Sequence, residues 1–284
     1  MKTYFRRAYD RLIMQPIVHK MLLPFGNELE PQKWIFIIGS YNSGTTLLAN
    51  ILRKHKDIGG LPTEGIYLTD SLEYPEKHGW PRMWSQCLDS MLIDNSIDQS
   101  KRARTIKKNW SIWYPKDTPC LAEKSIANSV RMPFLDSYFK PAYFINIVRN
   151  GYAVSAGIRK KANLKRWKNK YQDDSYPIEL CAKQWAMTYD IVDRDKENVE
   201  NCLTIYYEDL VSDPVKELKG IMAFLDLKEM ENSVIESKWD VHEKKSSEIR
   251  NMNEENIKLL SKDDIELINK AASKTLLRHG YKSL

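Results

Sequence analysis

A glycine-containing loop at residues 38–46, IGSYNSGTT, has the residue types that most directly indicate chemistry. Its glycines let the backbone turn tightly and point successive N–H groups inward, and Ser43, Thr45 and Thr46 add hydroxyl donors. A helix that starts at the end of the loop would aim its positive dipole end at the same point. The pattern therefore predicts a site for an anionic group such as a phosphate.

The loop differs from that of the nucleotide triphosphatases at one position. Those proteins carry a lysine where this chain has Thr45, and no apolar run that ends in aspartate follows to hold magnesium. We therefore expect the anion to be bound mainly by dipoles and hydroxyls, with cations supplied from elsewhere in the fold.

Apolar runs and helical periodicity place this loop between a strand and a helix. The run WIFII at 34–38 is typical of a strand that is buried on both faces, and residues 45–55 have helical spacing. Further strands are predicted at 120–123, 142–148 and 203–207, and further helices at 152–161, 178–194, 214–225 and 263–278. This alternation indicates an α/β fold of the P-loop-like, three-layer kind, with a central parallel sheet flanked by helices and ligands at the carboxyl ends of its strands.

The sequence also predicts how the chain is divided into domains. We expect a helical N-terminal extension at 1–30 and a single domain at 31–284. Residues 67–118 have no strand pattern and contain four tryptophans, which indicates a helical or irregular insertion that could wall a substrate cleft.

Charge and composition restrict the compartment and the partners. The formal net charge is +6, and residues 131–171 hold ten Lys or Arg and one acid, so we expect a face there that attracts an anion. The basic run 158–170 is more typical of a solvated helix face than of a binding site. The four cysteines form no CxxC pair, and no apolar run of about 18 residues occurs, so we expect a soluble protein of a reducing, cytoplasmic compartment.

The first 25 residues mix basic and apolar side chains. A terminal helix packed on its own domain is the favoured interpretation, because Pro16 limits a long amphipathic face. The alternative is peripheral contact with an anionic membrane surface, which in a bacterial cell would be the inner membrane.

Four motifs in order give this chain a family resemblance. They are the loop SGTT at 43–46, Glu123-Lys124-Ser125, IVRNGYAVSAG at 147–157, and YYEDLVSDP at 206–214 with FLDL at 224–227. In this order and spacing the chain resembles, over most of 34–284, the sulfotransferases that use 3′-phosphoadenosine 5′-phosphosulfate (PAPS). The resemblance implies PAPS as donor, 3′-phosphoadenosine 5′-phosphate (PAP) as product, and no required metal.

The resemblance also implies roles for the donor-binding residues. The loop from Asn42 through Ser43, Gly44 and Thr45 to Thr46 would bind the 5′-phosphosulfate, although the family usually has Arg or Lys where this chain has Asn42. Lys124 would steady the bridging oxygen as charge builds on the leaving phosphate, and we expect it to cover for the missing cation.

Other positions match the family less evenly. Arg149 would contact the 3′-phosphate, Lys161 would add a second cation there, and Tyr207 would pack on adenine. The family serine after the arginine is Gly157 here, so Ser155 is the available serine, and Arg250 is a candidate to close over the nucleotide.

The catalytic base follows from the same comparison. The histidine that small-molecule members carry after the lysine is absent, because Lys124-Ser125 is followed by Ile126. Glu64 lies shortly after the first helix, where protein-tyrosine and many carbohydrate or bacterial members carry a catalytic glutamate. The predicted catalytic residues are therefore Glu64 and Lys124.

The acceptor is the least constrained part of the prediction. A hydroxyl of a glycan or glycolipid is favoured by the glutamate-type base and by the basic, aromatic N-terminus. The alternatives are a protein tyrosine or a small alcohol, then a P-loop kinase of small molecules, then a non-catalytic polyanion binder. No specific nucleic acid is expected, and the oligomeric state stays open.

Overall fold

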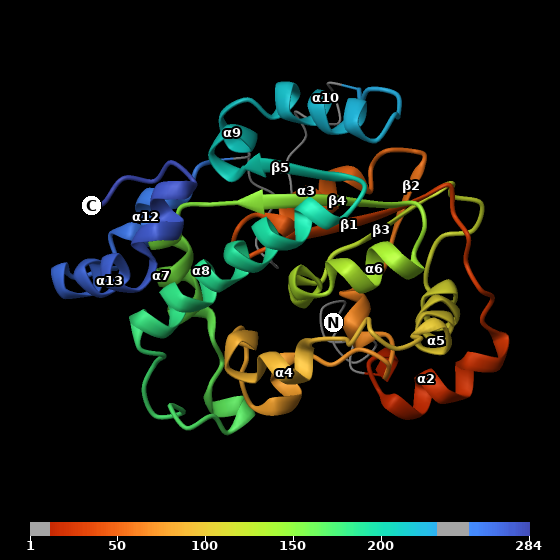
Figure 1. The fold of residues 1–284 in the computed structure, drawn as a ribbon, viewed down its shortest axis with the longest axis horizontal. Helices are drawn as coiled ribbons and strands as arrows, with labels where there is room; N and C mark the ends of the chain where they lie inside the picture. The colour runs from red at the N-terminus through yellow and green to blue at the C-terminus, as the bar shows by residue number, and fades with distance from the viewer. Residues whose placement is uncertain (1–11, 232–249) are drawn as a thin grey trace, which may run out of the picture.

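The computed structural model describes residues 12–231 and 250–284, and within them five parallel strands form one sheet (Figure 1). The strand order is β2-β3-β1-β4-β5. The strands are β1 Lys33–Gly39, β2 Ile58–Gly60, β3 Cys120–Glu123, β4 Ala142–Val148 and β5 Cys202–Tyr206. The parallel sheet predicted from the alternation of strands and helices is confirmed.

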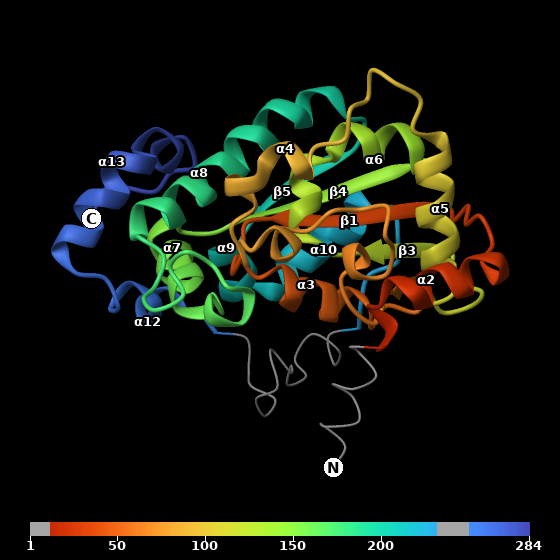
Figure 2. The same ribbon diagram turned by 90° about the horizontal axis from the view of Figure 1, so that it is seen from below.

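Strand β1 lies in the middle of the sheet and is covered on both faces. Ile35 and Ile37 pack against α3 (Thr45–Leu52) and α10 (Pro214–Phe224). On the other face Trp34, Phe36 and Ile38 pack against α5 (Ser100–Ser111), α6 (Met132–Tyr138) and α8 (Ile178–Asp195). Figure 2 shows the two layers of helices with the sheet between them. Each such buried side chain contributes about 1.5–3 kcal/mol relative to exposure, so β1 anchors the three-layer core.

The remaining helices complete the layers and the carboxyl-end side of the sheet. They are α2 Pro16–Leu22, α4 Leu88–Met91, α7 Gly151–Lys161, α9 Tyr207–Ser212, α12 Asn253–Ile257 and α13 Lys262–Arg278. Short 3-10 turns occur at Leu23–Phe25, Gly65–Tyr67, Pro75–His78, Trp84–Cys87, Ile126–Val130, Lys165–Trp167 and Lys196–Asn198. Helix α13 begins with a reciprocal capping box between Ser261 and Asp264, which fixes its start one residue before the predicted one.

Three local predictions differ from the structure. Helix α3 ends at Leu52 and not at His55, and Tyr207 opens α9 instead of ending β5. The edge strand β2, Ile58–Gly60, was not predicted, because three residues with two glycines carry no strand pattern.

The insertion at 67–118 contains no strand, as predicted. Two of its tryptophans, Trp84 and Trp110, are fully buried and anchor it to the domain. Helix α2 packs on this insertion: His19 Nδ1 lies 3.0 Å from Asp70 Oδ1, and Asn109 Nδ2 donates to the His19 carbonyl at 3.2 Å. The helical segment that includes residues 12 and 13 ends before Gln15, and α2 begins at Pro16, so the predicted interruption at this proline is confirmed.

Three of the ten basic residues between 131 and 171 do not belong to an exposed basic face. Arg131 and Arg149 are buried, and Arg159 forms an ion pair with Asp264 at 2.7 Å. Helical phase and sheet order send these side chains to different parts of the core and surface. No helix in the described part of the chain is long and apolar enough to cross a membrane.

Candidate active site

The loop between β1 and α3 lies where the order of the strands reverses. Strand β1 has β3 on one side and β4 on the other, so the residues that follow these two strands flank the loop. Lys124 follows β3, and Arg149 follows β4. In Figure 1 the arrowheads of β4 and β5 point toward α7 and α12, which places these helices at the carboxyl ends of the strands.

The loop has a backbone conformation that depends on its glycines. Gly39 has φ 140°, and a Cβ there would lie 2.5 Å from the Ile147 carbonyl oxygen. Gly44 has φ 100°, and its Cβ would lie 2.8 Å from the Tyr207 ring. The N-terminal N–H groups of α3, which have no partner within the helix, follow directly after Gly44. The predicted anion-binding loop therefore has the required curvature.

Glu64 and Lys124 form an ion pair at the end of β3. Lys124 Nζ lies 2.5 Å from Glu64 Oε1, and the side chains are 13% and 23% exposed. Partial burial leaves both groups within reach of a ligand while strengthening their interaction. The structure thus brings together the two residues that were predicted to be catalytic.

The buried carboxylate of Glu123 holds this pair in place. It accepts the Gly65 N–H at 2.7 Å and Asn128 Nδ2 at 2.6 Å, and the Ser125 hydroxyl also donates to it. Burial raises the pKa of Glu123, while the hydrogen bonds from Ser125 and Gly65 oppose that rise. Trp110 Nε1 donates to the Gly65 carbonyl at 3.0 Å. The segments that carry Glu64 and Lys124 are therefore fixed to each other through Glu123.

Arg149 supports the loop from the β4 side. Its Nη1 donates to the Asn42 carbonyl at 2.6 Å, and its Nε donates to Asn253 Oδ1 at 2.8 Å. The guanidinium lies 4.1 Å from the centre of the Tyr207 ring. Burial lowers the pKa of Arg149, and its Nη2 has no hydrogen-bond partner within residues 12–231 and 250–284. One buried donor of this arginine is therefore left for a ligand.

The two departures from the family pattern, Asn42 and Gly157, are in contact. A Cβ at Gly157 would lie 3.2 Å from Asn42 Cγ and Nδ2. Asn42 has φ 62°, and its buried Nδ2 has no partner in the described part of the chain. The glycine in α7 thus makes room for the asparagine of the loop.

Tyr207 and Arg250, two other predicted donor-binding residues, are in contact with each other. The Tyr207 hydroxyl donates to the Arg250 carbonyl at 3.1 Å and accepts the Met252 N–H at 3.2 Å. The Arg250 side chain is exposed and pairs with Glu255 at 3.1 Å.

Ser155 and Lys161 are both on α7. The Ser155 hydroxyl is buried and donates to the Gly151 carbonyl within the helix at 2.7 Å. Lys161 is exposed at the far end of α7, about 15 Å along the helix axis from Gly151. The structure therefore brings Asn42, Arg149 and Tyr207 into contact, and it places Ser155 inside α7 and Lys161 at the C-terminal end of that helix.

Sequence reasoning missed three residues that complete the site. Arg82 Nη1 donates to Asn42 Oδ1 at 3.4 Å, although the surrounding PRMW carries no motif. Glu208 Oε1 accepts the Asn150 N–H at 3.0 Å and Asn253 Nδ2 at 2.6 Å. Glu208 is part of the motif YYEDL, so its presence there was the available signal, whereas Asn253 lies in no recognisable pattern.

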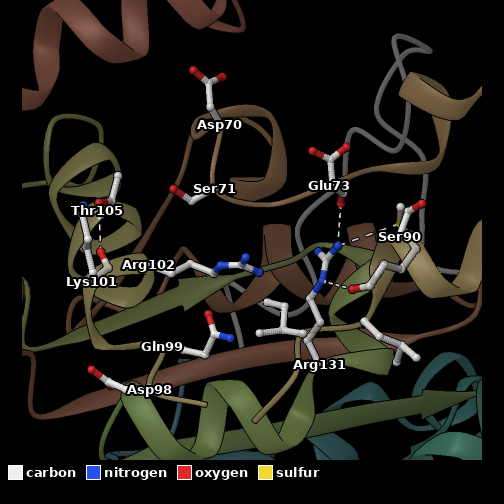
Figure 3. A pocket seen from close by; sticks show the side chains of 13 residues that line it. Asp70, Ser71, Glu73, Ser90, Asp98, Gln99, Lys101, Arg102, Thr105 and Arg131 are labelled. Carbon is white, nitrogen blue, oxygen red and sulfur yellow. Dashed lines mark hydrogen bonds between the residues drawn. The ribbon is translucent and has the colours of Figure 1, made fainter. Parts of the chain in front are cut away.

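A cavity of about 440 Å³ lies in the insertion, away from the Glu64–Lys124 pair (Figure 3). Arg102 extends toward Arg131 across it. Arg131 donates to the carbonyls of Met91 and Glu73 at 2.7 and 2.6 Å, and burial lowers its pKa to about 10. The Glu73 carboxylate at the rim already pairs with Lys77 at 3.2 Å. The cavity is polar and carries both signs of charge, because the acids Asp70, Glu73 and Asp98 line it together with the bases Lys101, Arg102 and Arg131. No group of His, Cys, Asp and Glu within residues 12–231 and 250–284 could hold a metal ion.

The structure is a P-loop-like α/β fold with a glycine-containing loop between β1 and α3 and a Glu–Lys pair at the end of β3. The family model of the sulfotransferases matches residues 34–232, and the chain belongs to the sulfotransferase family. It is 26% identical over 202 residues to protein-tyrosine sulfotransferase A of Caenorhabditis elegans, covering 68% of this chain and 50% of that protein. The match to protein-tyrosine sulfotransferase 1 of Danio rerio is 26% over 204 residues, covering 68% and 53%. The chain spans about half the length of these curated relatives.

Solved structures agree on the fold. A sulfotransferase domain from the curacin biosynthetic pathway aligns with a TM-score of 0.52 at 17% identity, covering 88% of this chain and 98% of that domain. A sulfotransferase of Mycobacterium avium aligns with a TM-score of 0.55 at 12% identity, covering 92% and 79%. The P-loop-like fold class predicted from the sequence is confirmed.

Proposed function

We propose that this protein transfers a sulfuryl group from PAPS to a hydroxyl acceptor. The observation that carries the proposal is the Glu64–Lys124 pair at 2.5 Å, presented at the end of β3 beside the loop 38–46. Membership of the sulfotransferase family supports it. The pair combines a proton acceptor with a cation, which are the two groups that such a transfer requires.

The residues around the loop fit an anionic donor. Arg149 Nη2 and Asn42 Nδ2 are buried donors without a partner in the described residues, and a buried donor is costly unless a ligand or water satisfies it. We propose that Asn42–Thr46 hold the 5′-phosphosulfate and that Arg149 faces the 3′-phosphate. When bound, PAPS supplies an activated sulfuryl group and a phosphate leaving group.

The two catalytic residues have complementary roles. Glu64 takes the proton of the acceptor hydroxyl as the acceptor oxygen forms its bond to sulfur. Lys124 stabilises the negative charge that stays on the phosphate when the bond from sulfur to the bridging oxygen breaks. Its ammonium has three N–H donors, so it can keep its contact with Glu64 and still reach a ligand.

Fewer contacts support the donor-binding roles proposed for the remaining predicted residues. We propose that Tyr207 shapes the nucleotide site by holding Arg149 and the 250–252 segment, consistent with its expected place beside adenine. Lys161 and Arg250 are proposed as exposed cations that contact the nucleotide at longer range. The intrahelical bond of Ser155 favours a role in stabilising α7 over direct phosphate binding.

Two classes of acceptor are proposed. A glycan or glycolipid hydroxyl remains the proposal drawn from the sequence, and a tyrosine hydroxyl is favoured by the two curated relatives, which are protein-tyrosine sulfotransferases. The cavity near Arg102 is lined by both acidic and basic side chains, so it does not favour one acceptor class over another. Transfer of labelled sulfate to glycan, glycolipid and tyrosyl-peptide acceptors would separate these classes.

The catalytic assignment is tested with Glu64→Gln. We expect turnover to fall by about two to four orders of magnitude while PAP, added without magnesium, still raises the unfolding temperature. A matched control is Glu179→Gln, which removes the carboxylate of an exposed ion pair with Lys183 (2.7 Å) and should leave turnover unchanged. Retained turnover in Glu64→Gln would contradict the role of this residue. Stabilisation only by ATP with magnesium would instead favour the kinase alternative.

We also propose that α2 contacts an anionic membrane surface. Ile17, Met21 and Phe25 are 63%, 65% and 76% exposed, and Lys20 lies among them. We expect the protein to sediment with vesicles that contain phosphatidylglycerol, and Ile17→Asp with Met21→Asp to prevent this. Equal sedimentation of the variant would rule out contact through α2.

A further inference from the structure

Arg82 reaches the loop 38–46 from the insertion. Its Nη1 lies 3.4 Å from Asn42 Oδ1, and its guanidinium lies 5.9 Å from the centre of the Tyr41 ring. Asn42 is the position at which the sulfotransferase resemblance leads one to expect a cation. A positive charge is therefore present beside this position, although it comes from a different part of the chain.

The segment that carries Arg82 is fixed to the domain on both sides. Tyr176 donates its hydroxyl to the Pro81 carbonyl at 3.1 Å, and Asn169 Nδ2 donates to the Gly79 carbonyl at 2.6 Å. Met83 and Trp84, which follow directly, are fully buried. Arg82 itself has φ 61°, a left-handed conformation that a non-glycine residue keeps only when its surroundings enforce it. The packing of this segment thus directs Arg82 at the loop.

Arg82 forms no ion pair with a carboxylate within residues 12–231 and 250–284. Burial raises the pKa of Glu76, and the nearby charge and backbone N–H of Arg82 oppose that rise. A guanidinium has five N–H donors, and the contact with Asn42 at 3.4 Å uses one of them weakly. The remaining donors can bind an oxyanion.

We propose that Arg82 is the cation that binds the phosphosulfate at the loop, in place of the side chain missing at position 42. The proposal rests on the sulfuryl-transfer function and adds to it a donor-binding residue from the insertion. The planar guanidinium can contact two oxygens of a phosphate or sulfate group at once. Lys124 was expected to replace the missing cation; its ammonium pairs with Glu64 and keeps its other donors for the bridging oxygen. In this proposal Arg82 and Lys124 therefore bind different oxygens of the phosphosulfate.

Relocating the charge tests the proposal. Arg82→Asn removes the cation, and asparagine tolerates the left-handed backbone better than most residues. We expect kcat/KM for PAPS to fall by about one to two orders of magnitude, with an unfolding temperature within about 2 °C of the wild type. Adding Asn42→Lys to this variant should restore a large part of the loss, and Arg82→Lys should be intermediate. The control is Arg104→Asn, which removes an exposed cation of the same insertion that pairs with Glu28 at 3.1 Å.

Three outcomes are decisive. Unchanged donor kinetics in Arg82→Asn would overturn the proposal. A loss that Asn42→Lys does not restore would also overturn it, because Arg82 would then act by shaping the loop and not by its charge. Failure of the sulfuryl-transfer function is distinguishable from both, since the wild type itself would then neither bind PAP nor turn over PAPS, and the proposal for Arg82 would fall with it.

Discussion

Gly157→Ala tests the contact between α7 and the donor-binding loop. Alanine is favoured over glycine inside a helix by about 0.8–1 kcal/mol. The added Cβ would lie 3.2 Å from Asn42 Cγ and Nδ2, and overpacking of this kind costs about 1–3 kcal/mol. We therefore expect Gly157→Ala to lower the free energy of unfolding by between about 0 and 2 kcal/mol, since the steric cost equals or exceeds the helical gain.

The effect of Gly157→Ala on the free energy of unfolding should change sign when the Asn42 side chain is removed. Asn42→Gly deletes the side chain and suits the backbone φ of 62° at this position. In that background Gly157→Ala should raise the free energy of unfolding by about 1 kcal/mol, which gives a coupling of about 1–3 kcal/mol between the two sites. Gly220→Ala is the matched control, because Gly220 lies in α10 with no atom within 4 Å of its added Cβ. It should stabilise both backgrounds equally.

Urea titrations of the four members of the cycle measure this coupling. Calorimetric titration with PAP adds a functional measurement, because the Asn42 carbonyl accepts Arg149 Nη1 at 2.6 Å and a shifted loop should weaken binding. Equal effects of Gly157→Ala in the presence and absence of the Asn42 side chain would refute the reasoning.

Three further predictions concern buried residues: Glu123 and Tyr207 of the candidate site, and His279, which ends helix α13. Glu123→Ala should cost about 2–4 kcal/mol in urea unfolding, because the buried donors Gly65 N and Asn128 Nδ2 lose their acceptor; a loss below 1 kcal/mol would contradict this. Burial lowers the pKa of His279 below its usual 6.5, so the folded protein favours the neutral ring. The contribution of this ring to the free energy of unfolding is therefore complete above pH 6.5. It is lost as the pH falls from there through the lower pKa of the folded state. His279→Gln should therefore show a shallower loss of unfolding free energy than the wild type on acidification from pH 7, and parallel curves would exclude His279 as the cause. Tyr207→Phe keeps the ring beside Arg149 but removes two hydrogen bonds to the 250–252 segment. We expect the free energy of unfolding to fall by about 1–2 kcal/mol and the calorimetric Kd for PAP to rise. Unchanged values would show that these hydrogen bonds contribute nothing.

The elements with local signals could be predicted from the sequence. The apolar run at 34–38 and the glycines of the following loop depend on nearby residues alone, and they appear as β1 and the β1–α3 loop. Edge strand β2 lacked such a signal, because its partner residues in β3 lie 62 residues further along the chain. The start of α9 at Tyr207 was also missed, because Tyr207 continues the aromatic strand pattern and no glycine or proline marks the end of the strand.

The sequence by itself predicted the central sheet from periodicity and the glycine-containing loop from turn chemistry, which are properties of short stretches. The order of its motifs singled out Glu64, Lys124 and Arg149 through the family resemblance. Tertiary structure decided which of these residues meet. The sheet order set Lys124 and Arg149 on opposite sides of the loop, and the path of the insertion brought Arg82 to Asn42. The contact of Asn42 with Gly157 depends on how α7 packs against the loop. Such contacts join residues far apart in the chain, so burial and packing geometry, and not local residue pattern, decide them.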